Sequence, residues 1–371
     1  MQEILIPLLR CPVTRSALSL QVISTSTKVY DGHEEKVIQN GIFYSEQDWF
    51  YPVIQGIPRL IVEAFLDYES FFREYLPDYT RKRNYLENKY GGLIKYVRRK
   101  NEHSKQSFSQ EWNLFDYEKD KTWNEGPDGM YQRFLKETIE TNESLAGKLI
   151  LDAGCGNGLL NQGIAKKGAL IIGMDFSLSI LKAYERNAEK KALFIQGDIQ
   201  FPPVAFEAFD IVHSSGVLIC TNNTELSFSC IEPCVKQGGK LSVWLYHPRK
   251  NFIHKVFNLI RRITSKLPVK AQYYLYLVTV FPVSFLIKRL KGNHQNRREI
   301  MVGILDWLSP RYRWEHTHEE AASWFYKRRY HNVQVTTSDL FGFNITGEKE
   351  ISNAGDILIN TYTERNESRD F

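Results

Sequence analysis

The sequence lacks a long apolar run, a set of paired cysteines and a strong excess of charge. Crossing a membrane takes roughly 20 consecutive apolar residues, and no run in the 371-residue chain is that long. Five cysteines are an odd number for a large chain, which favours reduced thiols over a disulfide framework. A net charge of +5 argues neither for nor against nucleic acid. Residues 1–10 lack a basic region and a cleavage site, so we expect no signal peptide there and predict a cytoplasmic protein.

The stretch around which the chain is organised is residues 149–158, LILDAGCGNG. Three aliphatic residues lead into an acid and then into three glycines, which is typical of a buried parallel strand that ends in a tight turn. Glycines let the backbone turn sharply and approach a ligand, and the first turn of the next helix offers free N–H groups. This stretch predicts a site for a nucleotide-like molecule.

From residue 148 onward, strand patterns alternate with helix patterns, which predicts an α/β fold with a doubly wound parallel sheet. The predicted strands are 149–151, 169–174, 192–196, 209–213 and 240–246. Ligands of such sheets bind at the carboxyl ends of the strands. Asp152, Asp175, Asp198 and the pair Ser214 and Ser215 all fall at those ends.

The acid before the first glycine distinguishes this turn from a phosphate-binding one. The phosphate-binding pattern is G-x-G-x-x-G, whereas this chain has D-x-G-x-G-x-G from Asp152. A carboxylate there suits a ligand with an ammonium group better than a pyrophosphate. Asp175 ends the second strand, where a carboxylate accepts hydrogen bonds from ribose hydroxyls. Asp198 ends the third strand and is placed to accept from an adenine amino group.

Together these features resemble class I S-adenosylmethionine-dependent methyltransferases of the type 11-like group, over residues 149–246. The resemblance implies a Rossmann-like fold with a seven-stranded sheet whose final strand is antiparallel. It also implies S-adenosylmethionine as cofactor, with no metal. The cofactor-binding residues carried over are Asp152, Gly154, Cys155, Gly156, Asp175, Phe176, Asp198, Ile199, Ser214 and Ser215.

The first 62 residues predict a separate small β domain. LLRCP at 8–12 and YPVIQGIP at 51–58 resemble the Trm112-like zinc-ribbon family. Zinc in such a site needs about four ligands, but Thr14 stands where a second cysteine would be, and residues 40–50 contain none. We therefore expect the fold without the metal. Relatives of this domain activate other methyltransferases, so the resemblance implies a protein partner or a homodimer through this unit.

Two further regions are predicted to be helical. Residues 63–147 form a linker with aromatic clusters at 108–115 and 131–135, which we interpret as a lid or as ordinary core. Residues 247–316 are a basic insertion whose apolar stretch, 273–287, is broken by Pro282. A helical cap over the substrate site is favoured over peripheral membrane contact, and nucleic acid is the least favoured partner.

Residues 317–371 predict a helix from Thr317, which fits a capping box with Glu320. Two last strands are expected at 333–337 and 357–363, with Phe341 and Phe343 between them near the substrate.

The function indicated is in-line methyl transfer from S-adenosylmethionine to a small-molecule acceptor, which depends mainly on alignment. An oxygen acceptor also needs a base, and the candidate catalytic residues are His316, His247 and Tyr246, with His213 less favoured. The alternatives are a cofactor-binding partner or scaffold protein, and a lipid or tRNA methyltransferase that uses the basic insertion.

Overall fold

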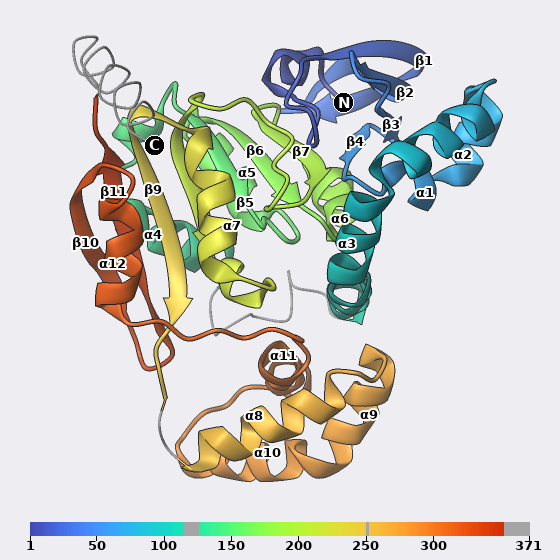
Figure 1. Cartoon of the computed structure of the whole chain (residues 1–371). Helices are drawn as coiled ribbons and strands as arrows, with labels where there is room; N and C mark the ends of the chain where they lie inside the picture. The colour runs from blue at the N-terminus through green and yellow to red at the C-terminus, as the bar shows by residue number, and fades with distance from the viewer. Residues whose placement is uncertain (115–125, 250–251, 352–371) are drawn as a thin grey trace, which may run out of the picture.

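The computed structural model describes residues 1–114, 126–249 and 252–351. Its centre is one 11-stranded sheet in the order β1-β2-β3-β4-β7-β6-β5-β8-β9-β11-β10. Figure 1 shows the N-terminal strands at one edge of this sheet, β10 at the other edge, and helices on both faces. The sequence analysis predicted a seven-stranded sheet beside a small N-terminal β domain. The sheet has eleven strands, because the four N-terminal strands pair onto its edge at β7 and continue it.

The middle of the sheet is parallel and agrees with the predicted strands. Its strands are β5 (Leu149–Ala153), β6 (Leu170–Asp175), β7 (Ala192–Gly197), β8 (Phe209–Ser215) and β9 (Val235–Tyr246). The crossover helices between them are α5 (Leu159–Ala165), α6 (Ser179–Arg186) and α7 (Thr224–Ile231). Residues 150–153 of β5 are all buried, as expected for a central strand covered on both faces.

The C-terminal edge is an antiparallel hairpin of β10 (Tyr330–Ser338) and β11 (Gly342–Lys349), preceded by α12 (His318–Tyr326). β11 lies between β10 and β9 and is antiparallel to both. The predicted strand at 333–337 lies within β10. The predicted partner at 357–363 lies outside the described part of the chain, within which β10 pairs with β11. The hairpin closes earlier because the Asp339 side chain accepts hydrogen bonds from the backbone N–H groups of Phe341 and Gly342.

The N-terminal strands form an antiparallel meander. They are β1 (Leu18–Tyr30), β2 (His33–Ser45), β3 (Phe50–Ile54) and β4 (Ile57–Leu60). β4 then pairs in parallel with β7, with Arg59 opposite Gln196 and Leu60 opposite Gly197. The buried side chains of this meander and of the parallel strands form one continuous core. The segment therefore extends the sheet, and its Trm112-like character stays a prediction.

Cys11, the cysteine of the predicted zinc-ribbon motif, is buried, and its Sγ lies 3.2 Å from the Tyr51 hydroxyl. Among the described residues, no three His, Cys, Asp or Glu side chains are grouped so that they could hold a metal ion.

The segment between the meander and β5 supplies helices to the carboxyl edge of the sheet. They are α1 (Ala64–Asp67), α2 (Glu69–Tyr75), α3 (Tyr79–Leu114) and α4 (Pro127–Thr138). Short 3-10 turns are η1 (Glu3–Leu8), η2 (Glu143–Leu145), η3 (Leu218–Cys220) and η4 (Glu232–Cys234). The lid predicted at 108–115 lies outside the residues whose side chains the structure describes.

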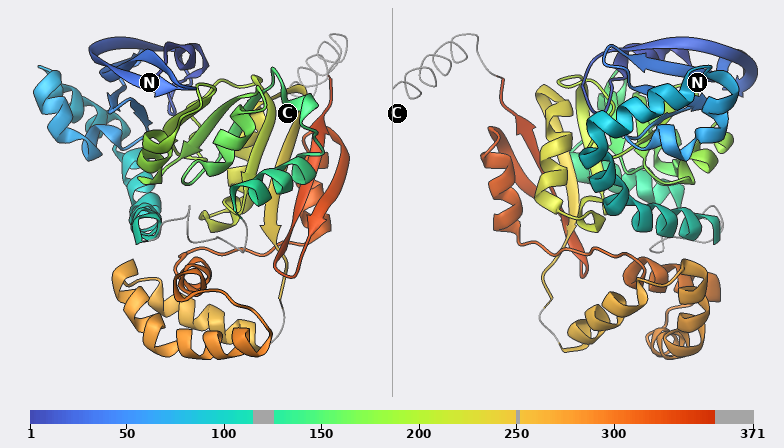
Figure 2. Two further views of the ribbon diagram at one scale, coloured as in Figure 1. Left: turned by 180° about the vertical axis from the view of Figure 1, so that it is seen from behind. Right: turned by 45° about the vertical axis from the view of Figure 1, so that its right-hand side comes forward.

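The insertion after β9 is a helical lobe, as the sequence predicts. Its helices are α8 (Phe252–Thr264), α9 (Val269–Thr279), α10 (Phe281–Leu290) and α11 (Arg297–Leu308). The lobe lies beyond the carboxyl ends of the strands, at the far end of the molecule from the N-terminal strands, and α11 lies between the sheet and the other three helices (Figures 1 and 2). It has its own apolar core around Tyr276, Met301 and Leu305.

No single helix in the described ranges is long and apolar enough to cross a membrane. α9 and α10 together meet the test of length and composition, but the chain bends by 53° between them.

Candidate active site

Two adjoining cavities lie at the carboxyl edge of the parallel strands. The first, of about 230 Å³, is lined by the ends of β5, β6, β7 and β8. The second, of about 830 Å³, lies between the sheet, α4 and the helical lobe, and its volume is typical of a small-molecule site. Five residues line both cavities: Arg133, Ser215, Gly216, Tyr246 and Asp306. The two cavities therefore meet along a shared wall.

The turn after β5 needs its first glycine. Gly154 has a φ of +99°, and an added Cβ would lie 2.4 Å from a side-chain carbon of Val217. The backbone N–H groups of Gly154 and Cys155 both donate to the carbonyl of Met174, at 2.7 and 3.1 Å. This pairing folds the turn back toward β6, so that Cys155, Gly156 and Asn157 line the first cavity.

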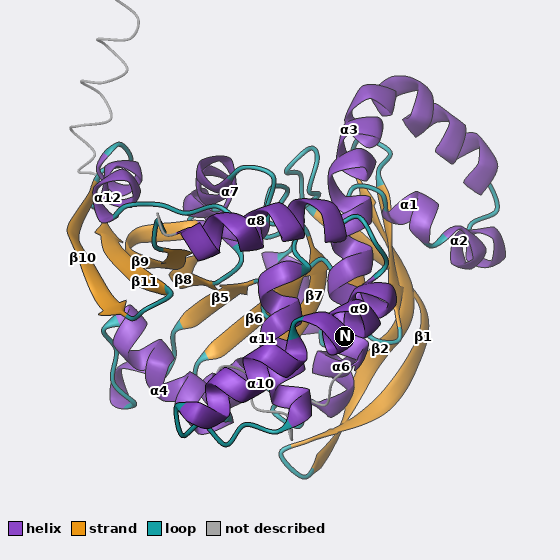
Figure 3. Cartoon of the chain, turned by 90° about the horizontal axis from the view of Figure 1, so that it is seen from below, coloured by secondary structure: helices purple, strands orange, loops and turns teal. Residues whose placement is uncertain are grey.

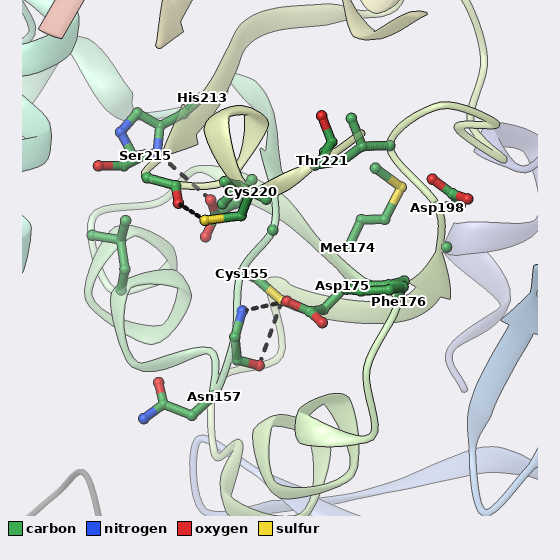
Figure 4. A pocket seen from close by; sticks show the side chains of 18 of the residues that line it. Cys155, Asn157, Met174, Asp175, Phe176, Asp198, His213, Ser215, Cys220 and Thr221 are labelled. Atoms are coloured by element: carbon green, nitrogen blue, oxygen red, sulfur yellow. Dashed lines mark hydrogen bonds and ion pairs between the residues drawn. The ribbon is translucent and has the colours of Figure 1, made fainter. Parts of the chain in front are cut away.

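Asp175 at the end of β6 is fixed by three hydrogen bonds. Its Oδ1 accepts from the backbone N–H and the hydroxyl of Ser177, at 2.8 and 2.7 Å, and its Oδ2 accepts from the backbone N–H of Gly156 at 3.0 Å. Burial raises the pKa of this carboxyl, and the hydrogen bonds oppose that rise. Figure 4 shows Asp175 and Phe176 toward one end of the cavity and His213 and Ser215 toward the other.

Asp198 at the end of β7 is held by α3. The Lys100 ammonium lies 2.7 Å from its Oδ2, and the Asn101 side chain donates to the same oxygen at 2.8 Å. The backbone N–H of Gln200 donates to Oδ1 at 2.9 Å. Burial raises the pKa of Asp198, but the charge and hydrogen bonds of Lys100 outweigh it, so the pKa is lowered overall. The carboxylate is therefore ionised and oriented toward the cavity it lines.

Asp152, His213 and Glu137 form a buried charged row across the cavity floor. Nε2 of His213 lies 2.8 Å from a carboxylate oxygen of Glu137, and Nδ1 lies 3.6 Å from Oδ1 of Asp152. Burial alone would lower the pKa of His213. The carboxylates of Asp152 and Glu137 outweigh that effect and raise the pKa to about 9. His213 is therefore protonated at neutral pH, and this contradicts any role for it as a general base there.

The structure brings nearly all the predicted cofactor residues to the first cavity. Those that line it are Asp152, Gly154, Cys155, Gly156, Asp175, Phe176, Asp198, Ile199 and Ser215. Ser214 is the exception: its buried hydroxyl donates to the carbonyl of Ala153 at 2.8 Å. Successive side chains of a strand point to opposite faces, so Ser214 faces the neighbouring strand while Ser215 faces the cavity.

Two of the three predicted catalytic residues are not among the residues that line the two cavities. Nε2 of His316 is 3.0 Å from the Thr224 hydroxyl on α7, and its Nδ1 is 3.0 Å from a carboxylate oxygen of Glu320 on α12. Nε2 of His247 is 3.2 Å from the hydroxyl of Ser338 on β10, a residue that lines the second cavity. Their catalytic roles stay predictions.

Tyr246, the third candidate, lines both cavities. The guanidinium of Arg313 lies 3.9 Å from the centre of its ring. Burial, together with the charge of Asp306, raises the pKa of the Tyr246 hydroxyl well above its ordinary value. The hydroxyl stays protonated at neutral pH, so Tyr246 can position a ligand but cannot accept its proton.

Several cavity residues were missed by the sequence analysis: Lys100, Asn101, Arg133, Glu137, Asp306 and Tyr312. The sequence contains one indication of the role of Glu137, because this acid shares the buried face of α4 with Tyr131 and Phe134. An acid on an apolar helix face needs a partner, and that partner is His213.

Comparisons with known proteins bear on the parallel part of the sheet. Residues 151–243 match the family model of a methyltransferase domain. The match confirms the methyltransferase prediction for this part of the chain. The matched segment contains the glycine turn, Asp175, Asp198 and His213.

Two curated relatives are similar to part of this chain. A ubiquinone biosynthesis O-methyltransferase of Coxiella burnetii is 34% identical over 106 residues, which are 28% of this chain and 45% of that protein. A demethylmenaquinone methyltransferase of Renibacterium salmoninarum is 27% identical over 143 residues, covering 38% of this chain and 57% of that protein. The chain thus spans about half the length of these relatives.

Among solved structures, the magnesium protoporphyrin IX methyltransferase of Synechocystis PCC 6803 with bound SAH is similar over 60% of this chain and 82% of that chain, at 15% identity. The TM-score of 0.36 is too low to support an inference.

Proposed function

We propose that the chain transfers a methyl group from S-adenosylmethionine to a small, largely apolar acceptor bound in the second cavity. The observation that carries this proposal is the wall of five residues shared by the two cavities. A donor in the first cavity and an acceptor in the second would meet at Ser215, Gly216 and Tyr246. The names of the curated relatives, which refer to ubiquinone and demethylmenaquinone, support a small-molecule acceptor.

The residues present fit the cofactor. A carboxylate offers about four acceptor positions, and three are occupied on Asp175 and three on Asp198. One position on Asp175 Oδ2 and one on Asp198 Oδ1 stay open for the hydroxyl and amino groups of a nucleoside. When bound, S-adenosylmethionine supplies a methyl group on a positively charged sulfur.

The charged row at the other end of the cavity favours a cationic ligand group. His213 lies between Asp152 and Glu137, and Nε of Arg133 lies 3.8 Å from the other carboxylate oxygen of Glu137. The negative charge offered to a ligand is therefore that of Asp152. Asp152 lines the cavity, and His213 fixes it from behind. Electrostatic stabilisation of this kind is strong because the groups are buried and already oriented.

The acceptor side combines an apolar wall with a few charged groups. Phe257, Ile300, Trp307 and Phe341 supply apolar surface in the second cavity. Asp306 is the carboxylate that lines both cavities. It is therefore placed to accept the proton of an acceptor hydroxyl as the oxygen is methylated.

An experiment with methyl-labelled cofactor tests this proposal. The protein is incubated with labelled S-adenosylmethionine and, separately, with an organic-solvent extract of cells, a water-soluble metabolite extract and total RNA. Label that moves into the organic-soluble pool supports the proposal. Label in RNA alone, or binding of the cofactor without transfer to any pool, would overturn it; the second result would indicate a cofactor-binding scaffold protein.

A further inference from the structure

The helical lobe carries an apolar face that points away from the rest of the molecule. Val278, Leu286 and Leu290 are 72%, 60% and 79% exposed. The other exposed apolar residues of this face, called here the outer face, are Val256, Leu259, Ile263, Leu267, Tyr274, Leu275, Val283, Phe285 and Ile287. Figure 3, seen from below, shows α8, α9 and α10 on this end of the molecule, where α9 packs against α10 and α8 packs against α11. Contiguous apolar surface on this scale marks an interaction site.

On α10, four of the exposed apolar residues share one side of the helix. On α10, Val283, Leu286, Ile287 and Leu290 follow the i, i+3, i+4, i+7 pattern of a side that helices normally bury. α10 nevertheless has no fully buried residue.

α9 also has one buried side and one exposed apolar side. It buries Val269, Gln272 and Tyr276 in the lobe, and it exposes Tyr274, Leu275 and Val278. The lobe's own core forms without these exposed side chains, so the described residues leave the outer face uncovered.

Charge indicates the chemistry of an occupant for this face. Residues 252–300 contain ten lysines and arginines and one acid, Glu299. Exposed basic residues flank the apolar ones on each helix: Arg262, Lys266, Lys270, Arg289 and Lys291. Helices that combine an apolar side with lysine and arginine bind at the surface of anionic membranes.

We propose that the outer face of α8, α9 and α10 docks on the surface of an anionic lipid bilayer. The helices lie in the interface, with their apolar side chains below the headgroups and their basic side chains among the phosphates. Two other occupants are disfavoured. A second copy of the same face would bring like charges together, and an RNA would use the basic residues but leave the apolar ones exposed.

Docking in this orientation gives the second cavity a lipid-facing wall. Ser284 and Lys288 on α10, and Val280 between α9 and α10, also line the second cavity. An apolar acceptor could therefore pass from the bilayer to the cavity without crossing water. This last step rests on the proposed function, whereas docking itself does not.

Co-sedimentation with vesicles tests the docking. The full chain is mixed with vesicles of phosphatidylcholine alone and of phosphatidylcholine with one third phosphatidylglycerol, at low and high salt. We expect binding to the anionic vesicles that weakens as salt rises. In the variant Val278→Glu/Leu290→Glu, which changes two highly exposed residues, the affinity for anionic vesicles should fall by about tenfold or more.

A matched control adds the same two charges elsewhere. Val22→Glu/Tyr326→Glu changes exposed residues on β1 and α12, and it should bind vesicles like the wild type. Wild type that does not bind anionic vesicles, or a loss shared equally by both variants, would overturn the proposal. So would a wild type that self-associates through this face, shown by ultracentrifugation of the same variants. No S-adenosylmethionine is present in these tests, so their outcome is independent of whether the chain transfers methyl groups.

Discussion

Nε2 of His213, on β8, lies 2.8 Å from a carboxylate oxygen of Glu137, on α4. Both side chains are almost completely buried. The backbone carbonyl of the same Glu137 accepts hydrogen bonds from Ser242, Thr336 and Asn344, on β9, β10 and β11. α4 is therefore attached to the sheet at one residue by its side chain and its backbone, and that residue borders the first cavity.

The pH dependence of stability should report this contact. The pKa of His213 is raised from 6.5 to about 9, a rise that corresponds to about 3 kcal/mol. Because the folded pKa lies above the unfolded one, this stabilisation is fully present below about pH 6.5 and is lost as the pH rises through about 9. Urea unfolding measured from pH 6 to 10 should show that decline.

The variant His213→Asn leaves Glu137 and Asp152 buried without their cation. We expect it to lower the free energy of unfolding at pH 7 by about 3 kcal/mol and to flatten the decline between pH 7 and 10. A variant that keeps the full decline would show that another group causes it.

The Lys100–Asp198 pair offers a second test of buried charge. Both side chains are only 8% exposed, and their charged atoms are 2.7 Å apart. Lys100→Met should cost about 3–5 kcal/mol of unfolding free energy, because it leaves a buried carboxylate unpaired. Replacing both charges, in Lys100→Met/Asp198→Asn, should restore most of that loss.

The Lys100–Asp198 pair also predicts a loss of folding stability at low pH. The pKa of Asp198 is lowered from 3.8, so its stabilisation is present above pH 3.8 and is lost as the pH falls below that value. Guanidinium unfolding of the single and double variants checks the magnitudes. If the double variant is no more stable than Lys100→Met, the carboxylate was not the source of the loss.

Asp175 should control affinity for the cofactor. Hydrogen bonds to a charged group contribute about 1.5–3 kcal/mol, so Asp175→Ala should weaken S-adenosylmethionine binding about 10- to 100-fold in calorimetry. Asp210→Ala is the control, since Asp210 also accepts a backbone hydrogen bond, from Leu149 at 2.8 Å, but at the opposite end of the sheet. Equal affinities for the wild type and Asp175→Ala, with both folded by circular dichroism, would contradict the placement.

The parallel strands and the glycine turn were predictable because their signals are local. A buried strand such as 149–153 is an apolar run in the sequence, and the turn after it has to contain glycine at residue 154. Three acids at three strand ends then converge on one edge by the geometry of the sheet alone. For this reason the glycine turn and the three acids of the first cavity could be predicted from the sequence.

What the sequence analysis missed depends on contacts between distant segments. β4 pairs with β7 through Arg59 and Gln196, and no local pattern distinguishes a strand that joins another sheet from one that ends its own. The hairpin of β10 and β11 escapes local prediction for a related reason, since it depends on hydrogen bonds to the Asp339 side chain. His316 is a candidate by its place just before the predicted helix from Thr317, but which groups its ring contacts, Thr224 and Glu320, depends on the packing of distant segments.

The central claim is that the second cavity holds the acceptor while the first holds the cofactor, and filling the second cavity tests it most directly. Gly303 on α11 lines only the second cavity, and an added Cβ there meets no atom within 4 Å. Gly303→Trp should therefore place a large ring in that space. We predict unchanged calorimetric affinity for S-adenosylmethionine and at least about a tenfold loss of methyl transfer to the organic-soluble acceptor. Unchanged transfer, with the cofactor still bound, would contradict the account.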